Sequence, residues 1–241
     1  MIYYLKTILI FVWLIVASAV GLVWALLNWG NPKSLRDFGL LFSYGALKIA
    51  GIKAEVFGKD KIVQNSPAVL IGNHQSALDV AIFSLIAPPN CTIVIKREVR
   101  WIPFVGLMFM AARSILIDRK NRSQAMKEIK KASRRIHDEN LCVGFFPEGT
   151  RNRSGIGLLP FKKGAFKVAI DAQIPIIPIV ASSISPLINH QSKRFKGGTI
   201  QIKVLDPIST KGLTGKDTDR LMNDAHKEMI AALNDAAPKG H

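Results

Sequence analysis

A histidine and an aspartate, His74 and Asp79, lie five residues apart in the stretch IGNHQSALDV, directly after the apolar run AVLIG. In a regular helix a step of five residues turns the chain by about 500°, which leaves the two side chains about 140° apart. The pair can therefore meet only if His74 lies on a loop and Asp79 lies in the first turns of the helix that follows. An imidazole held on one nitrogen by a carboxylate can act as a general base through the other. The competing interpretation is a single polar turn after a strand.

The sequence offers this base no enzyme nucleophile. Ser76 is two residues from His74, and no Gly-x-Ser-x-Gly elbow occurs in the chain. Both cysteines, Cys91 and Cys142, have apolar neighbours, which predicts buried strand thiols rather than a disulfide framework or a metal site. A base without a nucleophile must activate a hydroxyl of the substrate, or water. This favours direct transfer in a ternary complex.

A second polar segment, FFPEGTRNRSG at residues 145–155, follows another apolar run. Gly149 would let backbone amides approach a ligand closely, and Arg151 would present a planar guanidinium to a phosphate group. Three lysines follow within residues 162–167. One interpretation is phosphate recognition. The other is a tight turn in which Glu148 and Arg151 form a surface ion pair of little energetic value.

The elements that must position these residues alternate along the chain. Short apolar runs predict strands at 52–58, 68–72, 92–96, 114–117, 141–146, 176–181 and 199–205. Helical patterns fall between and after them, at about 76–87, 103–112, 122–138, 161–172 and 217–236. This alternation predicts an α/β fold with a central, mostly parallel sheet of about seven strands flanked by helices.

Four polar clusters each follow one of the predicted strands. They are Asn73-His74, Lys96-Arg97-Glu98, Asp118-Arg119 and the run from Pro147 to Arg151. In sheets of this kind ligands bind outside the carboxyl ends of the strands. If the strands are parallel, the four clusters share one rim. Their convergence supports a functional site more strongly than any one cluster does.

The N-terminal part of the chain is apolar. The 21 residues at 7–27 carry no charge, and at about 1.5 Å per residue they match the thickness of a hydrocarbon core. A Gly-Asn-Pro break at 28–32 leads into a second segment at 34–52, whose apolar residues recur at helical spacing. The two segments predict a pair of apolar helices.

Several placements of this helix pair compete. The first helix could cross a membrane, or the pair could lie in one leaflet without crossing, or the second helix could pack on the soluble domain. A cleaved signal peptide is disfavoured, because the apolar run continues eight residues past the Ala-Ser-Ala at 17–19. We expect a membrane-anchoring helix pair at 1–50 and an α/β domain at 51–241.

The net charge of +16 predicts attraction to an anionic partner, such as nucleic acid, an anionic membrane, a phosphate-bearing ligand or an acidic carrier protein. Nucleic acid is disfavoured, because the chain has no zinc-ligand spacing, basic zipper or aromatic-basic stacking motif. No metal site is expected, because the five histidines are dispersed.

These motifs together resemble the glycerolipid acyltransferase family, and within it the enzymes that acylate lysophosphatidic acid. NHQSALD has the His-x4-Asp pattern and FPEGTR the second signature. The segment KREVRWIPFVGLMFMAARSILIDR at 96–119 resembles the second block of the family, and IPIIPIVAS at 174–182 resembles the fourth. The ordered blocks cover about residues 68–182, and their combination is highly specific.

The resemblance implies transfer of a fatty acyl group from a thioester of coenzyme A or acyl carrier protein to the free sn-2 hydroxyl of 1-acyl-glycerol-3-phosphate. The product is phosphatidic acid, and no cofactor is required beyond the thioester co-substrate. His74 would be the general base and Asp79 its orienting partner. Pro178 and its neighbours would wall the acyl pocket. The acceptor would be bound by Lys96, Arg119, Glu148, Gly149, Thr150 and Arg151.

The resemblance also implies where the protein works and with what. Membrane lipids and acyl-CoA or acyl carrier protein would be its partners, and the catalytic domain would face the cytoplasmic side of the cell membrane, where thioester donors are made. One residue departs from the family pattern: Arg113 stands where a glycine is expected in Gly-x-x-x-x-Asp-Arg. It could add a phosphate contact or alter access to the acyl site. Alternatives are another acceptor, such as glycerol 3-phosphate or another lysophospholipid, a hydrolase, and a non-enzymatic basic membrane-binding module.

Overall fold

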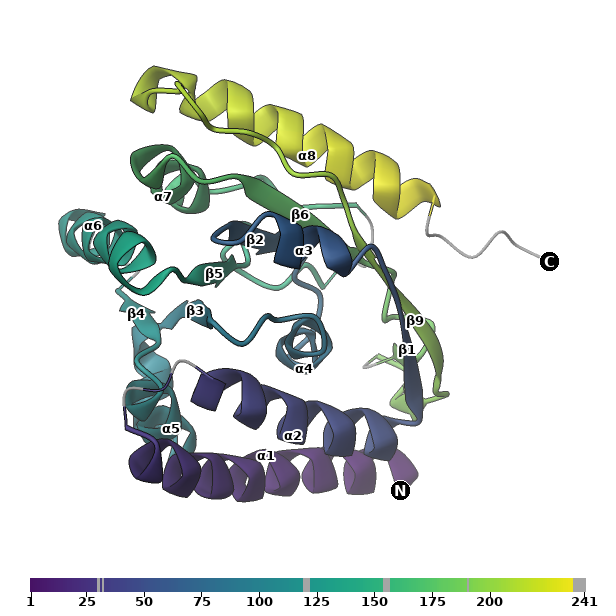
Figure 1. Cartoon of the computed structure of the whole chain (residues 1–241). Helices are drawn as coiled ribbons and strands as arrows, with labels where there is room; N and C mark the ends of the chain where they lie inside the picture. The colour runs from purple at the N-terminus through teal and green to yellow at the C-terminus, as the bar shows by residue number, and fades with distance from the viewer. Residues whose placement is uncertain (30, 32, 119–121, 154–156, 190, 236–241) are drawn as a thin grey trace.

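The predicted α/β fold is confirmed by a computed structural model of the chain, which describes residues 1–29, 31, 33–118, 122–153, 157–189 and 191–235. A central seven-stranded sheet carries helices on both faces (Figure 1). The strands lie in the order β1-β9-β6-β2-β5-β3-β4. They are β1 (Ile52–Phe57), β2 (Val69–Gly72), β3 (Cys91–Lys96), β4 (Ile115–Ile117), β5 (Cys142–Phe145), β6 (Ile176–Ala181) and β9 (Gly198–Val204).

All seven predicted strands occur, and the sheet is mostly parallel. Every neighbouring pair is parallel except β6 with β9, so β1 and β9 run opposite to the other five strands. The central strands β2 and β6 are buried along their whole length, which is why their sequences are continuous apolar runs rather than alternating ones. The small ribbon of β7 (Ile188–Asn189) and β8 (Arg194–Phe195) is absent from the sequence prediction, because two residues cannot show alternation.

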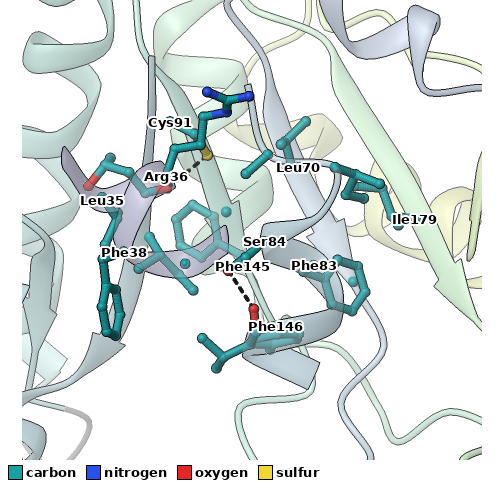
Figure 2. Close-up of a pocket in the computed structure, with 18 of the residues that line it drawn as sticks. Leu35, Arg36, Phe38, Leu70, Phe83, Ser84, Cys91, Phe145, Phe146 and Ile179 are labelled. Carbon is teal, nitrogen blue, oxygen red and sulfur yellow. Dashed lines mark hydrogen bonds between the residues drawn. The ribbon is translucent and has the colours of Figure 1, made fainter. Parts of the chain in front are cut away.

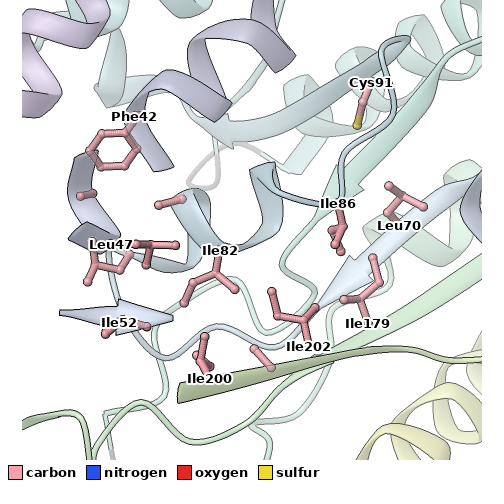
Figure 3. Close-up of a cluster of buried hydrophobic side chains, with 14 of the residues drawn as sticks. Phe42, Leu47, Ile52, Leu70, Ile82, Ile86, Cys91, Ile179, Ile200 and Ile202 are labelled. Carbon is pink, nitrogen blue, oxygen red and sulfur yellow. The ribbon is translucent and has the colours of Figure 1, made fainter. Parts of the chain in front are cut away.

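The helices form one layer on each face of the sheet (Figure 1). Along β2 the side chains alternate, so Val69 and Ile71 join the apolar cluster on one face of the sheet, while Leu70 joins the cluster on the other face with Ile82 and Ile179 (Figure 3). The helices are α2 (Lys33–Ala50), α4 (Asp79–Ser84), α5 (Val105–Ala111), α6 (Arg122–Glu139), α7 (Gly164–Ala172) and α8 (Thr218–Asp235), with short α3 (Asp60–Gln64), η1 (Arg97–Trp101) and η2 (Gly215–Asp217).

The two predicted N-terminal helices form a pair, but they differ in burial. Helix α2 lies between α1 (Ile2–Leu27) and the sheet, and Phe42 and Leu47 of α2 pack in the same core as Ile82 of α4 (Figure 3). Helix α1 buries only a narrow stripe of small residues, while most of its large apolar side chains are exposed. Within the described residues, α1 alone is long and apolar enough to cross a membrane.

The predicted boundary between residues 50 and 51 coincides with the end of α2. Because the core cluster joins Phe38 and Phe42 of α2 to Ile82 and Ile200 of the remainder, the helix pair is packed on the α/β part rather than set apart from it. The division of the chain into a membrane-anchoring part at 1–50 and an α/β domain at 51–241 stays a prediction.

Candidate active site

His74 and Asp79 meet as their spacing predicts. His74 lies on the loop after β2, and Asp79 is the first residue of α4. The His74 Nδ1 lies 2.7 Å from the Asp79 Oδ2. The His74 imidazole stacks on the Phe146 ring, with centroids 4.3 Å apart, and its side chain is 19% exposed. The Nε2 atom has no hydrogen-bond partner among the described residues, so it is free to meet a ligand.

One oxygen of Asp79 organises the whole loop. Asp79 is buried, and its Oδ2 also accepts hydrogen bonds from the backbone N–H of Gln75 at 2.5 Å and of Ser76 at 2.8 Å. A carboxylate in this position accepts the Nδ1–H of the neutral imidazole and so leaves the lone pair on Nε2. The geometry that a general base requires is therefore present. The Ser76 side chain is buried, its hydroxyl accepts a hydrogen bond from the Leu78 N–H at 3.2 Å, and among the described residues no hydrogen bond joins this hydroxyl to the His74 imidazole.

Two side chains that the sequence analysis did not assign hold this loop on β6. Asn73 is buried and makes a two-way contact with the Ala181 backbone: its amide donates to the carbonyl at 2.9 Å, and its oxygen accepts from the N–H at 2.8 Å. Gln75 donates to the Ala181 and Ser182 carbonyls, both at 3.1 Å, and accepts from the Ile184 N–H at 3.1 Å. Their partners are more than 100 residues away, so no local spacing could have revealed them.

Glu148 ties the second motif to the first. It is buried, and its two oxygens accept hydrogen bonds from the backbone N–H of His74 at 2.7 Å and of Leu159 at 2.9 Å. The Asn152 N–H donates to the His74 carbonyl at 2.7 Å. Both backbone polar groups of His74 are thus held by the segment after β5. Asn152 is a further contributor that the sequence analysis missed.

These contacts change the interpretation of Glu148. Burial raises the pKa of its carboxyl, and the N–H donors of His74 and Leu159 offset part of that rise because they stabilise the charged form. A buried carboxylate whose oxygens already have donors is a poor partner for a phosphate, so Glu148 positions His74 instead. The rival prediction of a surface ion pair between Glu148 and Arg151 is wrong, because Glu148 faces inward and no such pair forms.

Of the remaining predicted residues, Lys96, Gly149, Thr150 and Arg151 lie at or after the carboxyl ends of β3 and β5, which are adjacent and parallel to each other and to β2. Thr150 and Arg151 are exposed at this rim, and Gly149 turns the chain there with φ +70°. Lys96 ends β3 and forms an exposed ion pair with Glu98 at 3.1 Å. Arg119 lies outside the described residues.

An apolar pocket opens beside the pair (Figure 2). Its empty volume is about 670 Å³, counting the space that is open to solvent. Phe146, which stacks on His74, lines one part of it together with Phe83, and Leu35 and Arg36 of α2 line another. The pocket therefore extends from Phe146, the residue that stacks on the imidazole, to α2.

The expected role of Pro178 in walling an apolar pocket needs correction. Side chains alternate along β6, so Ile179 faces the pocket (Figure 2), while Pro178 points to the same side as Ile176 and Val180, which belong to the opposite core cluster. The prediction thus holds for a neighbour of Pro178 and fails for Pro178.

The backbone conformation at Arg113 explains why a glycine would suit this position. Its φ of +56° is a left-handed conformation that favours glycine. Its guanidinium is 2.7 Å from the Glu139 carboxylate, and its carbonyl accepts a hydrogen bond from the Arg135 guanidinium at 2.8 Å. The side chain is therefore held by α6 and lines a small polar hollow that shares Cys91 and Thr92 with the apolar pocket. An effect of Arg113 on phosphate binding or on access to the acyl site stays a prediction.

We expect Arg113→Ala to be less stable than Arg113→Gly by about 1 kcal/mol, because only the alanine variant keeps a Cβ in the left-handed conformation. Both variants lose the same partly exposed ion pair, worth up to about 1 kcal/mol, so their difference isolates the backbone strain. Urea unfolding of the two variants measures it. Equal stabilities would show that the protein relaxes around residue 113.

Among the residues that the structure describes, no group of three or more His, Cys, Asp or Glu side chains could hold a metal ion. The two cysteines are free and buried at the starts of β3 and β5, as their apolar neighbours predict.

Comparison with known proteins adds independent support for a family relationship. The sequence profile of the acyltransferase family matches residues 53–182. A 1-acyl-sn-glycerol-3-phosphate acyltransferase from Haemophilus influenzae is 35% identical over 244 residues, which covers 98% of this chain and 98% of that protein. The alpha form of the enzyme of that name from Homo sapiens is 36% identical over 213 residues, covering 88% of this chain and 74% of that protein.

A solved structure matches the fold over nearly the whole chain. The crystal structure of the 1-acyl-sn-glycerophosphate (LPA) acyltransferase PlsC from Thermotoga maritima is similar with a TM-score of 0.77, covering 97% of this chain and 94% of that one. The sequence identity is 19%, so this likeness bears on the fold alone.

Proposed function

The chain belongs to the acyltransferase family, and we propose that it transfers a fatty acyl group to the free sn-2 hydroxyl of 1-acyl-glycerol-3-phosphate, giving phosphatidic acid. The observation that carries this proposal is the His74–Asp79 pair, whose imidazole stacks on Phe146, a residue that lines the apolar pocket, and which follows β2 at the end of the sheet where exposed cationic side chains follow β3 and β5. The acceptor is an amphiphile that needs both kinds of surface. The relatives named above support the choice of acceptor.

In the proposed mechanism His74 Nε2 removes the proton of the sn-2 hydroxyl as its oxygen attacks the thioester carbonyl carbon. A C–O bond forms, and the C–S bond breaks when the tetrahedral intermediate collapses. The imidazolium then returns the proton to the departing thiolate, so His74 ends neutral. Asp79 stabilises the imidazolium while it exists, and the Phe146 ring and the Glu148 contact fix the imidazole position.

The acceptor phosphate is proposed to bind among the exposed residues of the rim, above all Arg151, with Lys96, the Thr150 hydroxyl and the turn at Gly149 beside it. A guanidinium suits this task because its fork of donors matches a phosphate group. Arg119 lies outside the described residues, and its phosphate role stays a prediction.

We expect Arg151→Ala to raise the acceptor KM by about 10- to 100-fold while kcat changes little, because a charge-assisted hydrogen bond is worth about 1.5–3 kcal/mol. Steady-state rates at a fixed, saturating donor concentration measure the change. Arg153→Ala is the matched control, since Arg153 is also exposed and lies two residues away. An unchanged acceptor KM in Arg151→Ala would refute the phosphate role.

The apolar pocket is proposed to hold the acyl chain of the donor. Its lining is mostly aliphatic and aromatic, and it includes the Phe146 ring that stacks on His74. Gly144 of β5 lines the pocket, and a Cβ at this position would find only ordinary contacts, the nearest being the Thr92 carbonyl oxygen at 3.7 Å. A larger side chain there would fill pocket space without straining the backbone.

We therefore expect Gly144→Val to lower turnover of long-chain donors about tenfold relative to short-chain donors, because the lost volume corresponds to a few methylene groups. A series of saturated acyl-CoA donors from 8 to about 18 carbons measures the profile. Gly215→Ala is the control, since a Cβ there meets nothing within 4 Å. An unchanged chain-length profile would place the acyl chain elsewhere.

The protein is proposed to work at the cell membrane with its α/β part on the cytoplasmic side. The exposed apolar side chains of α1 support membrane association, and the location of thioester donors supports the side. Acyl-CoA or acyl carrier protein would be the donor, and the basic surface suits the acidic carrier as well as anionic headgroups. The thioester is already activated, so the proposed reaction uses no cofactor.

A matrix of donors and acceptors tests the function. Purified protein in vesicles receives acyl-CoA or acyl carrier protein thioesters together with lysophosphatidic acid, glycerol 3-phosphate, another lysophospholipid or no acceptor. We expect phosphatidic acid with lysophosphatidic acid alone. Fatty acid release without an acceptor would indicate a hydrolase, and lipid binding without transfer would indicate a binding module.

A further inference from the structure

The segment from Trp101 to Met110 presents large apolar side chains to solvent. Their exposures are 73% for Trp101, 37% for Ile102, 46% for Phe104, 53% for Leu107 and 50% for Met110. Phe104, Leu107 and Met110 recur every three residues, so they share one face of α5, while Met108 and Phe109 face inward. A patch of this size on a protein surface indicates contact with another apolar phase.

The turn that leads into α5 displays Phe104 at an energetic cost. Phe104 has a φ of +58°, a conformation that is strained for a bulky residue. The turn is closed tightly, because the Gly106 N–H donates to the Ile102 carbonyl at 2.8 Å and a Cβ at Gly106 would lie 2.2 Å from the Arg100 carbonyl oxygen. The strained turn holds the Phe104 ring outward, where within the described chain it gains little packing.

This surface continues the apolar face of α1. Helix α5 lies beside α1 (Figure 1), and Met108 of α5 approaches Gly21 of α1, where a Cβ would be 3.3 Å from the Met108 Cγ. In the same part of α1 the large side chains Val20, Val23 and Trp24 are exposed. The two helices thus expose apolar side chains next to each other, although they are about 80 residues apart in the sequence.

The charges next to the patch suit an anionic lipid surface. The Arg100 guanidinium stacks on the Trp101 ring, 4.4 Å from its centroid, an arrangement in which tryptophan would lie at headgroup depth and arginine beside lipid phosphates. Lys96 stands just before η1, and Arg97 is its first residue. Their acidic neighbours are Glu98, paired with Lys96, and Asp118, 3.7 Å from Arg97. The cations exceed the acids here by one.

We propose that the surface of residues 101–110 inserts into an anionic phospholipid leaflet beside α1 and forms a second membrane contact. This inference rests on the proposed function, which supplies the lipid acceptor. The second contact would hold the carboxyl end of β3, with Lys96, at the headgroups. An acceptor embedded in the leaflet would then reach the rim sideways, without leaving the membrane.

A fluorescent label tests the insertion directly. The full chain carrying Leu107→Cys is labelled with an environment-sensitive fluorophore; the native Cys91 and Cys142 are buried, and labelled wild-type protein gives the background. On vesicles of phosphatidylglycerol and phosphatidylethanolamine, we expect a blue shift of about 10 nm or more and quenching by spin-labelled acyl chains, because the label leaves water for hydrocarbon. Lys227→Cys, exposed on α8 across the sheet, is the matched control and stays unquenched.

The outcomes separate this inference from the proposed function. Quenching at Leu9→Cys of α1 without quenching at Leu107→Cys would refute the second contact. The membrane contact of α1 and the proposed acyl transfer would not be affected by that result. A blue shift of the Leu107→Cys label before vesicles are added, with the mass of a dimer in detergent, would assign the patch to a second copy of the chain and refute the proposal. Acyl transfer is measured on the same samples, so a failure of the proposed function shows as absent turnover whatever the quenching.

A kinetic variant gives a second readout. Leu107 is exposed, so the variant Leu107→Glu should fold. We expect Leu107→Glu to raise the KM for an acceptor embedded in vesicles about fivefold or more, because a charge is costly to insert in a membrane. The KM for a short-chain acceptor dissolved in water should not change. Equal changes for both acceptors would refute a membrane role for this residue.

Discussion

His74→Ala is expected to lower acyl transfer by about 10³-fold at any acceptor concentration, because general base catalysis typically supplies about 10²–10⁴-fold. The loss should appear in kcat, since Nε2 acts on the hydroxyl only as the C–O bond forms and contributes little to acceptor binding. The rest of the loop is anchored without the imidazole: Asn73 and Gln75 hold it on β6, and Glu148 binds the backbone N–H of residue 74. The variant should therefore fold and still bind both substrates.

Rescue by added imidazole, together with a control variant, distinguishes a general base from a histidine with a purely structural role. Added imidazole should restore part of the activity of His74→Ala, because the space left above the Phe146 ring can receive it. His226→Gln is the control, since His226 lies on α8 beside Phe161, on the opposite side of the sheet, and should keep full turnover. Full turnover in His74→Ala would end the general base assignment.

The fold could be predicted from the sequence where the strands are short apolar runs between polar turns. The central strands have both faces buried, so their runs carry hardly any polar residue and stand out clearly. The helix predicted at 76–87 begins instead at Asp79, because residues 73–78 use their polar groups to hold the loop rather than to form helical turns. Elements of two to five residues, such as β7, β8 and α3, are too short for a period to appear.

Part of the candidate site could also be predicted from the sequence, for a different reason. The His74–Asp79 contact is local, so a spacing argument could test it. The supports are not local: Phe146 and Glu148 approach His74 from more than 70 residues away, and the sequence gives no sign of which side chain turns inward. Glu148 sits in a polar run that resembles a ligand-binding loop. Only the fold of that run over the His74 loop reveals its burial.

Asp79→Asn is expected to lower kcat by about 10²–10³-fold while leaving the position of His74 nearly unchanged. The reason is the unequal use of the two carboxylate oxygens. Oδ2 accepts all three hydrogen bonds, from His74, Gln75 and Ser76, whereas Oδ1 is buried without a hydrogen-bond partner in the described chain. An asparagine can place its oxygen at the Oδ2 position and keep all three bonds. What it removes is the negative charge that stabilises the imidazolium.

The same hydrogen-bond geometry predicts the stabilities of the variants Asp79→Asn and Asp79→Ala. The amide NH₂ of asparagine would occupy the buried Oδ1 position without an acceptor, which costs about 1–3 kcal/mol. Asp79→Ala should be less stable still, because it leaves the N–H groups of Gln75 and Ser76 without their acceptor. Urea unfolding, read beside kcat at saturating acceptor, separates the two effects. Asp217→Asn is the matched control, since Asp217 also accepts a backbone N–H at a helix start, that of Thr214, far along the chain from the pair.

The size of the loss in Asp79→Asn decides between two accounts of the pair. A loss near that of His74→Ala would mean that the amide has turned round, donating to Nδ1 and placing the proton on Nε2, so that orientation of the tautomer is what Asp79 supplies. Turnover above half of the wild-type value would mean that the charge of Asp79 is irrelevant and that the imidazolium is stabilised elsewhere. An intermediate loss is expected, because the backbone N–H groups of Gln75 and Ser76 favour the oxygen at their side and oppose the turned amide.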